Sequence, residues 1–452
     1  MKNHIIPVIL IFVVVLAVFS LLSTKVLFTD APQYVNTAKE FAGFALSKVR
    51  NFSAWLYPLL LGESLKIVPS LVTLKLVNLL WLVLDVLVLY WFSRRASVVW
   101  LFVFSPLVWV TAPWINPILP VSFFLLFAYV ALQKFEVTKK AVWFIVSGLS
   151  LGLVSALWWP GTYLVVLFLF SFFLQKRFSQ LIVYLIPVAG AASIRLVIDW
   201  YYFSFPFFSA IRGLGSNFLY FTGQADIIPG IKPPALLIFA LILVVVSPLV
   251  FRLYKVDRRV YGRELLFLAL ATLLFCMNLE IRYFITIVPL VLLLLSFVLE
   301  KKEIVLHAFI GVLLIIFLTH SYFGMTDDHL LQQDVVQLGK DFPDKIFIVG
   351  TDGVSEEQAM DLSTLYWGDD IKGFVTYRDY QLSMVDERVY KEYIFASSSR
   401  INELRNMRLS LTYERSDEDL DDLQDLLIIG DAPPPAGFKL VKQYAVLRYY
   451  QR

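Results

Sequence analysis

The strongest constraint on this chain is a series of long apolar runs separated by short polar connections. About eleven of these runs, 16 to 24 residues long, are close to the roughly 20 residues that an α-helix needs to cross the hydrocarbon core of a bilayer. They cover residues 5–24, 69–92, 97–112, 116–133, 141–157, 159–175, 179–197, 233–252, 263–278, 282–299 and 304–320. Because a helix satisfies its own backbone hydrogen bonds in lipid, the pattern predicts an α-helical polytopic membrane protein.

The charged residues are distributed unevenly along the chain. Residues 326–452 contain 24 of the 36 acidic residues but only 14 of the 39 basic residues. The first 325 residues are therefore basic, and their Lys and Arg side chains stand in short loops between apolar runs. This placement is typical of membrane topology, so we expect the lipid bilayer as a partner and no nucleic acid.

The basic connections alternate with uncharged ones and so predict the topology. Lys and Arg fall in the connections at 94–95, 134–140, 176–177, 252–263 and 301–302. The opposite connections at 112–117 and 158–161 contain neither residue type. The positive-inside rule then places the N-terminus in the cytoplasm, and an odd number of spans places the C-terminal part outside. We expect a multi-pass protein of the cell membrane.

The chain divides into a transmembrane domain, residues 1–322, and a soluble extracytoplasmic domain, residues 323–452. The second part predicts a small α/β domain with a helix beginning at Ser355, where the spacing of Ser355 and Gln358 matches a capping box. Its expected strands are Lys345–Val349, Phe374–Tyr377, Tyr393–Ala396, Leu426–Ile429 and Lys439–Tyr449.

Two outer connections, residues 25–68 and 198–232, are long, and long loops in compact proteins are usually functional. In the first loop, apolar residues recur at helical spacing and predict an amphipathic helix lying in the outer membrane interface. These residues are Tyr34, Ala38, Phe41, Ala45 and Val49.

Asp30 follows the first span at a depth where a carboxylate is partly desolvated and still reaches a substrate held by its lipid tail. A carboxylate in that environment is suited to act as a general base. Asp30 also fits the N-cap of a helix, because Pro32 and Gln33 follow at the positions preferred in a first helical turn. The two roles are compatible.

The second long loop begins with Asp199 and a run of aromatic residues that includes Tyr202, and it continues through Arg212 to Asn217. The aromatic rings either stack on a sugar or form the interfacial aromatic belt.

Arg282 opens a late span, between Glu280 and Tyr283, on the same side as Asp30. Its guanidinium either holds a lipid phosphate through paired hydrogen bonds or forms an ion pair with Glu280 or Asp199.

Asp85 lies inside a predicted span, where it serves either a structural hydrogen bond or a proton relay. The four histidines lack the spacing of a zinc site, and the single Cys276 has no partner cysteine. We therefore expect no protein-held metal site of this kind.

Three segments together resemble motifs of the GT-C class of membrane glycosyltransferases, which includes the dolichyl-phosphate-mannose-dependent mannosyltransferases. The segments are Asp30-x-x-x-Tyr34-x-x-x-Ala38, the loop from Asp199 through Pro206 to Asn217, and Arg282-Tyr283 through Pro289. Their common order and common side of the membrane carry the resemblance, which covers residues 1 to 320.

The resemblance implies transfer of a sugar, such as the hexose mannose, from a polyprenyl- or dolichyl-phosphate donor to an acceptor hydroxyl, with inversion. The acceptor would be a glycan, a lipid or a protein, and no cofactor is implied, whereas a need for a divalent metal stays open. Asp30 would be the catalytic base. Arg282, Arg212 and Lys66 would bind the donor phosphate. The sugar and acceptor would contact Tyr34, Asp199, Tyr202, Asn217, Glu280 and Tyr283.

Two other classes share the polytopic pattern: a flippase or transporter of lipid-linked sugars, and a non-catalytic scaffold with an acidic C-terminal part. Transporters usually place charged sites near the midplane and contain inverted repeats. Here the polar residues gather at one interface, which favours chemistry at the membrane surface.

Overall fold

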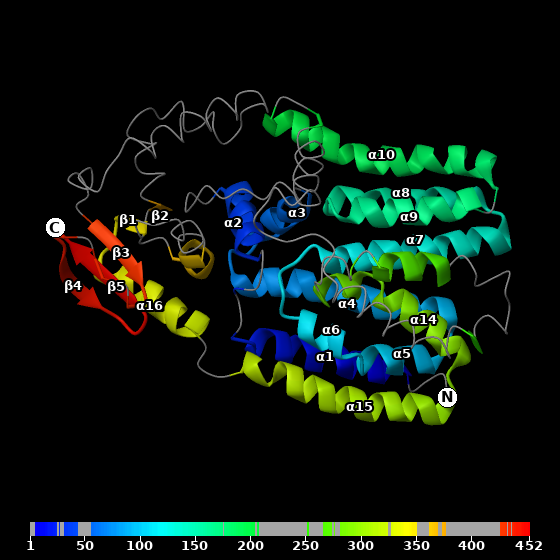
Figure 1. The fold of residues 1–452 in the computed structure, drawn as a ribbon, viewed down its shortest axis with the longest axis horizontal. Coiled ribbons are helices and arrows are strands. Elements are labelled where there is room, and N and C mark those ends of the chain that lie inside the picture. The colour runs from blue at the N-terminus through cyan, green and yellow to red at the C-terminus, as the bar shows by residue number, and fades with distance from the viewer. Residues whose placement is uncertain are drawn as a thin grey trace.

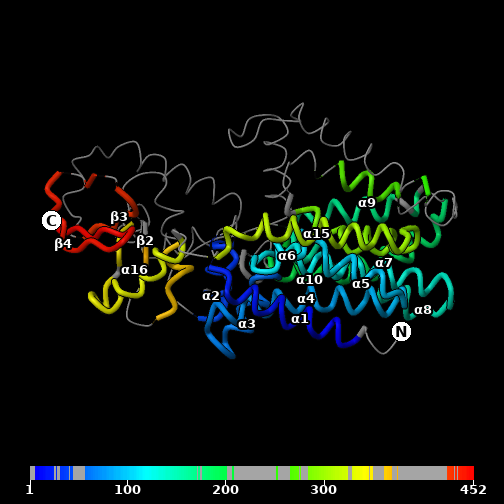
Figure 2. Tube along the Cα trace, turned by 90° about the horizontal axis from the view of Figure 1, so that it is seen from below, coloured from blue at the N-terminus to red at the C-terminus, as the bar shows by residue number. Residues whose placement is uncertain are grey.

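The fold is described from a computed structural model of the chain (Figure 1). The structure describes residues 5–24, 27, 31–43, 56–174, 176–203, 206–207, 251–252, 265–273, 275, 281–323, 327–349, 361–368, 373–376, 425–431, 433–434 and 436–452. Within these residues, a bundle of helices lies beside a small domain that contains a sheet, and Figures 1 and 2 place this domain at one end of the bundle.

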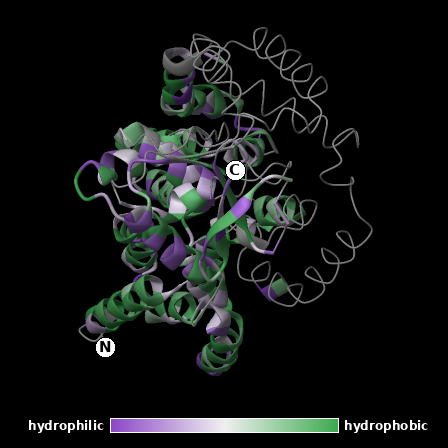
Figure 3. Cartoon of the chain, turned by 90° about the vertical axis from the view of Figure 1, so that its left-hand side faces the viewer, coloured by the Kyte–Doolittle hydropathy of each residue, from purple (hydrophilic) through white to green (hydrophobic). Residues whose placement is uncertain are grey.

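The helices of the bundle follow the predicted apolar runs. They are α1 (Ile5–Leu22), α4 (Leu71–Ser93), α5 (Ala96–Val103), α6 (Pro106–Thr111), α7 (Ile118–Thr138), α8 (Ala141–Leu157), α9 (Gly161–Leu174), α10 (Phe178–Phe203), α14 (Val288–Val298) and α15 (Lys301–Thr319). Short 3-10 helices η2 (Ile281–Thr286) and η3 (His320–Tyr322) flank the last two. Figure 3, which looks at the bundle from the side of the C-terminal domain, shows the bundle helices coloured mostly as hydrophobic.

Four described helices are long and apolar enough to cross a membrane: Leu71–Ser93, Ile118–Thr138, Phe178–Trp200 and Lys301–Tyr322. The predicted run at 97–112 is divided into α5 and α6, because Pro106 at the start of α6 has no N–H to continue α5. The predicted run at 233–252 lies almost wholly outside the described residues, so the span count stays a prediction.

Glycines bring α8 and α10 unusually close together. A Cβ atom added at Gly148 would lie 2.5 Å from Cγ of Pro187, and one added at Gly152 would lie 2.3 Å from the carbonyl oxygen of Val188. The two glycines are four residues apart, which is the small-residue spacing that lets membrane helices approach backbone to backbone.

The first long connection contains two further helices, α2 (Ala31–Ala42) and α3 (Leu56–Leu65), which pack against each other between the bundle and the C-terminal domain (Figure 1). A Cβ atom at Gly62 of α3 would lie 2.8 Å from the carbonyl oxygen of Ala38, so this packing is also close.

The C-terminal domain contains α16 (Asp327–Asp341) and a five-stranded sheet. The strands are β1 (Ile346–Val349), β2 (Gly373–Thr376), β3 (Asp425–Ile429), β4 (Lys439–Gln443) and β5 (Leu447–Gln451), in the order β2-β1-β3-β5-β4. β1 pairs in parallel with β2 and β3, whereas β5 pairs antiparallel with β3 and β4. Apolar residues of α16 and of the sheet form one core.

The predicted strand Lys439–Tyr449 is wrong as a single element, because the structure forms a hairpin there. The carboxylate of Asp334 on α16 accepts hydrogen bonds from the backbone N–H groups of Ala445, Val446 and Leu447, at 3.2, 2.6 and 3.0 Å. Asp334, which belongs to neither strand, therefore satisfies the backbone N–H groups of the turn between β4 and β5. The predicted strand at 393–396 and the helix start at Ser355 lie outside the described residues.

Candidate functional site

The candidate site lies at the end of the bundle that faces the C-terminal domain, called here the domain-facing end. It is bordered by α2, α3, the start of α4 and the end of α10 (Figure 1). Asp30, Arg212, Asn217 and Glu280 lie outside the described residues. Tyr202 stands in α10 and Arg282 in η2, and for these two only the backbone is described.

The predicted amphipathic helix is present as α2, although its polar face is not open to solvent. Tyr34 and Ala38 are buried on the apolar side, and Asn36, Thr37 and Lys39 are buried as well. The C-terminal domain covers this second face, which sequence periodicity alone does not reveal. α2 ends at Ala42, and Ala45 and Val49 of the expected helix lie outside the described residues.

Tyr34 is held in a network that joins three elements. Its ring meets the ring of Tyr57 on α3 edge to face, with 5.6 Å between centroids. The Tyr57 hydroxyl donates to Asn78 Oδ1 on α4 at 2.7 Å, and Asn78 Nδ2 donates to the carbonyl of Trp114 at 2.5 Å. Burial raises the pKa of Tyr57 well above its ordinary value, so the hydroxyl stays a donor. The network fixes the helix that follows Asp30.

Lys39 on α2 is the most deeply buried lysine described, with 1% of the residue exposed. Its Nζ donates to the carbonyl oxygens of Ser363 and Tyr366 at 2.5 and 2.7 Å, and it lies 3.9 Å from the ring centroid of Trp367. Burial lowers the pKa of Lys39 well below its usual 10.5. Sequence reasoning missed this residue, because its partners lie more than 300 positions away.

Asp199 is fully buried near the end of α10, one turn after Arg195. The Asp199 carboxylate interacts electrostatically with Arg195. Arg195 also donates to the carbonyl of Ser155 at 3.3 Å, and its guanidinium lies 5.4 Å from the ring centroid of Trp159. Arg195 was not predicted, although its i, i+4 spacing to Asp199 on a helix is a signal for such a pair.

Tyr283 is joined to the same region through Trp158, whose ring centroid lies 5.0 Å from that of Tyr283. Trp158 directly precedes Trp159 in the chain, so Tyr283 and Arg195 each lie beside one residue of the same Trp158-Trp159 connection. Lys66, by contrast, is half exposed and pairs with Glu63 at 2.6 Å. An exposed ammonium of this kind is free to exchange its partner at low cost.

Asp85 makes the structural hydrogen bond that was one of its two predicted roles. The Ser122 hydroxyl on α7 lies 3.2 Å from Asp85 Oδ2 and 3.1 Å from the carbonyl oxygen of Ile285 in η2. Asp85 is fully buried. The contact therefore connects α4, through α7, to the short helix that carries Arg282.

A second lysine, Lys75 at the start of α4, is buried and donates to the carbonyl oxygens of Ser20 and Ser23 at 3.0 and 2.8 Å. These carbonyls end α1, so Lys75 caps that helix. Among the described residues, no group of three His, Cys, Asp or Glu side chains is gathered to hold a metal ion.

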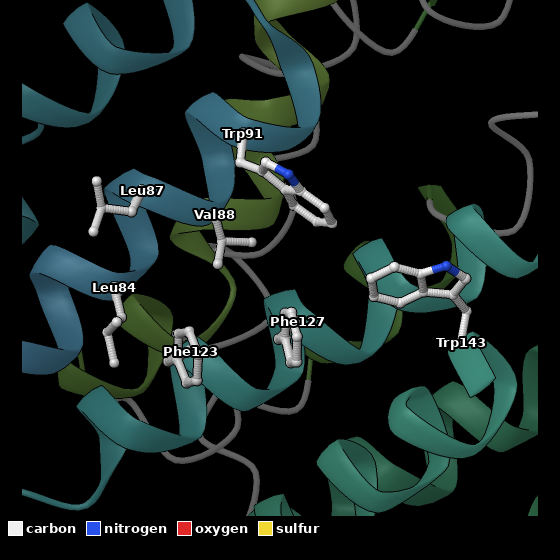
Figure 4. A pocket seen from close by; sticks show the side chains of 7 residues that line it. All are labelled: Leu84, Leu87, Val88, Trp91, Phe123, Phe127 and Trp143. Atoms are coloured by element: carbon white, nitrogen blue, oxygen red, sulfur yellow. The ribbon is translucent and has the colours of Figure 1, made fainter. Parts of the chain in front are cut away.

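An open apolar hollow of about 320 Å³ lies along α4, α7 and α8, and Figure 4 shows its lining. The residues are Leu84, Leu87, Val88, Trp91, Phe123, Phe127 and Trp143. The four lining residues from α4 belong to the half of that helix away from Lys75 and Asn78. The hollow contains no polar group that could orient a sugar or a phosphate, so it is distinct from the candidate site.

The arrangement of the helices and the C-terminal sheet is the fold of the GT-C class of membrane glycosyltransferases, which confirms the resemblance seen in the sequence. Together with the apolar helices, this fold makes the chain a membrane protein.

Two solved structures of ArnT from Cupriavidus metallidurans are similar to this chain. The structure bound to undecaprenyl phosphate matches with a TM-score of 0.64 and 10% identity, over 98% of this chain and 97% of that chain. The apo structure matches with a TM-score of 0.63 and 10% identity, over 99% and 98%. No family model and no curated protein sequence matches the chain.

Proposed function

We propose that the protein is a glycosyltransferase that moves a sugar from a polyprenyl-phosphate donor to an acceptor hydroxyl at the outer membrane interface. The observation that carries the proposal is the fold match over 98% of the chain to a structure bound to undecaprenyl phosphate. The buried polar network around Tyr34 and the buried residues Arg195 and Asp199 support a site at the domain-facing end. A site there requires the predicted topology, with the N-terminus inside and residues 323–452 outside.

In the proposed reaction, the Asp30 carboxylate takes the proton of the acceptor hydroxyl. The acceptor oxygen then attacks the anomeric carbon from the side opposite the phosphate, and the bond between that carbon and the phosphate oxygen breaks. The configuration of the sugar is inverted, and polyprenyl phosphate leaves. Arg282, assisted by Arg212 or Lys66, would stabilise the negative charge on the leaving phosphate, because fixed cations act strongly in a low-dielectric site.

The sugar and acceptor would be held by the remaining residues of the site. Asp199 stands one helical turn after Arg195, which lies beside Trp159, and Tyr283 lies beside Trp158. Tyr202, Asn217 and Glu280 stand close to these residues in the sequence. Tyr34 is buried, so its part in the site is to shape the wall formed by α2. A hexose such as mannose is the proposed sugar, on an undecaprenyl or dolichyl carrier, with a glycan, lipid or protein as acceptor.

The test is transfer of labelled sugar from a panel of polyprenyl-phosphate sugars by the purified full chain in nanodiscs. We expect Asp30→Asn to lower turnover about 10²- to 10⁴-fold, the usual contribution of a general base, while undecaprenyl phosphate still binds. Asp344→Asn is the matched control, because Asp344 is exposed in the C-terminal domain and its positive φ of 62° suits asparagine.

The outcomes separate the classes of function. Donor binding without transfer or hydrolysis from any donor would contradict the proposal and favour a flippase or a scaffold. Equal turnover in Asp30→Asn and Asp344→Asn would remove Asp30 from the role of base.

A further inference from the structure

The C-terminal domain contacts α2 through the C-terminal end of a short helical segment that belongs to the domain. Residues 361–365 are helical, and Tyr366 N–H closes the last turn onto the carbonyl of Leu362. The carbonyls that follow have no helical donor. Lys39 Nζ occupies this end, donating to Ser363 and Tyr366, and Asn36 Nδ2 donates to Thr364 Oγ1 at 3.0 Å. Asn36 and Lys39 lie one helical turn apart on α2, and both donate hydrogen bonds to residues 363–366 of the C-terminal domain.

The same domain also holds the chain on the other side of Asp30. The backbone N–H of Leu27 donates to Asp328 Oδ2, at the start of α16, at 3.1 Å. The Leu27 side chain packs against the apolar core of the C-terminal domain. Just before it, Thr24 N–H and the Thr24 hydroxyl both donate to the carbonyl of Tyr322, the last residue of the transmembrane domain, at 2.9 and 3.1 Å.

These contacts leave only a short stretch of chain between two anchored points. Leu27 and Ala31 enclose Asp30 in the sequence, and α2 begins at Ala31. Burying a lysine is costly unless its donors are satisfied, and Lys39 is satisfied by the C-terminal domain. A domain that served only to bind an acceptor would not need to bury a lysine of α2 against its own backbone carbonyls.

We infer that the C-terminal domain is a brace that positions Asp30, with Lys39 as the positioning residue on α2. The inference rests on the proposed function for the role of Asp30. Lys39 does not touch the reacting atoms; it acts by fixing the helix that begins immediately after the base. A displacement of about 1 Å in such a helix costs up to about 100-fold in rate.

The first arm of the test measures the brace without using activity. Hydrogen–deuterium exchange of the full chain in nanodiscs is compared for wild type, Lys39→Met and the control Lys340→Met, which changes an exposed lysine of the C-terminal domain. We expect exchange in residues 31–42 and 361–368 to rise about tenfold in Lys39→Met only, because local opening becomes easier. Unchanged exchange would overturn the inference whatever the activity.

The second arm measures turnover with the donor that wild type uses, and binding of undecaprenyl phosphate. We expect Lys39→Met to lower kcat about 10- to 100-fold with donor binding nearly unchanged, and Lys39→Arg to recover part of the loss. Asp328→Ala, which removes the contact before Asp30, should lower kcat in the same way.

The two arms keep the separate claims apart. Equal loss of donor binding and turnover, or full turnover despite raised exchange, would overturn the positioning role. Absence of transfer by wild type with every donor would refute the proposed function, and the exchange data would still show whether the brace exists.

Discussion

Tyr57 shows how single buried polar side chains set the shape of the domain-facing end. Its hydroxyl donates a hydrogen bond to Oδ1 of Asn78, and Nδ2 of Asn78 donates to the carbonyl oxygen of Trp114. The three residues come from α3, α4 and the connection before α7. A buried acceptor that loses its donor has no water to replace it, so the network is sensitive to a single atom.

Removal of the Tyr57 hydroxyl is expected to lower the stability of the folded protein. Tyr57→Phe leaves Asn78 Oδ1 without its donor, and we expect the folded state to lose about 1–3 kcal/mol. The thermal midpoint of the protein in detergent would fall accordingly. Tyr163→Phe on α9 is the control, since among the described residues the Tyr163 hydroxyl makes no hydrogen bond. Equal midpoints for the two variants would show that the network contributes nothing.

At the residue scale, the sequence suggests candidate residues but does not show what they contact. Asp199 and Tyr283 were chosen for their place at span ends, and their roles stay predictions. The structure places Arg195, one turn before Asp199, beside Trp159, and Tyr283 beside Trp158. Lys39 was missed because helical periodicity shows which residues share a face, not what covers that face, whereas Arg195 was missed although its spacing to Asp199 could be read from the sequence. The partners of Lys39 belong to residues 363–367, and no local pattern connects segments so far apart.

The packing of α8 against α10 depends on glycines, which have no side chain. Gly152 on α8 lies against the backbone of α10 at Val188, whereas a Cβ atom at Gly190 of α10 would meet nothing within 4 Å. Both positions are helical glycines in the same helix pair, so they differ chiefly in available space.

This difference predicts opposite effects for the same substitution. Gly152→Ala should force α8 and α10 apart and destabilise the fold by about 1–3 kcal/mol. Gly190→Ala should be neutral or stabilise by up to about 1 kcal/mol, because alanine favours the helix more than glycine does. Thermal midpoints in detergent measure both changes. A similar fall for both variants would mean that helix packing is not the cause.

At the element scale, hydropathy predicts apolar helices well because lipid leaves the backbone no alternative to internal hydrogen bonds. The division at Pro106 and the hairpin between β4 and β5 were not predicted. The hairpin turn, Tyr444-Ala445-Val446, contains no Gly, Pro, Asn or Asp, so it carries none of the usual turn signals. Its N–H groups are satisfied by Asp334 from another element, which no local sequence reading could supply.

At the scale of the whole molecule, the proposed chemistry and the brace both depend on one orientation in the membrane. The structure places the C-terminal domain, α2 and the end of α10 at the same end of the bundle (Figures 1 and 2). The basic connections at 94–95 and 134–140 follow α4 and α7 at their other ends. In the fold, the candidate site and these basic connections therefore lie at opposite ends of the bundle, and which end faces the cytoplasm stays a prediction.

Cysteine labelling turns this orientation into a measurement. Cys276 is the single cysteine, so Cys276→Ser gives a background into which Lys340→Cys or Lys140→Cys is introduced, both at exposed positions. We expect a membrane-impermeant maleimide to label intact cells carrying Lys340→Cys, and to label Lys140→Cys only after permeabilisation, because basic loops stay in the cytoplasm. The opposite pattern would place Asp30 and the C-terminal domain inside, where a donor sugar would be transferred to a cytoplasmic acceptor instead.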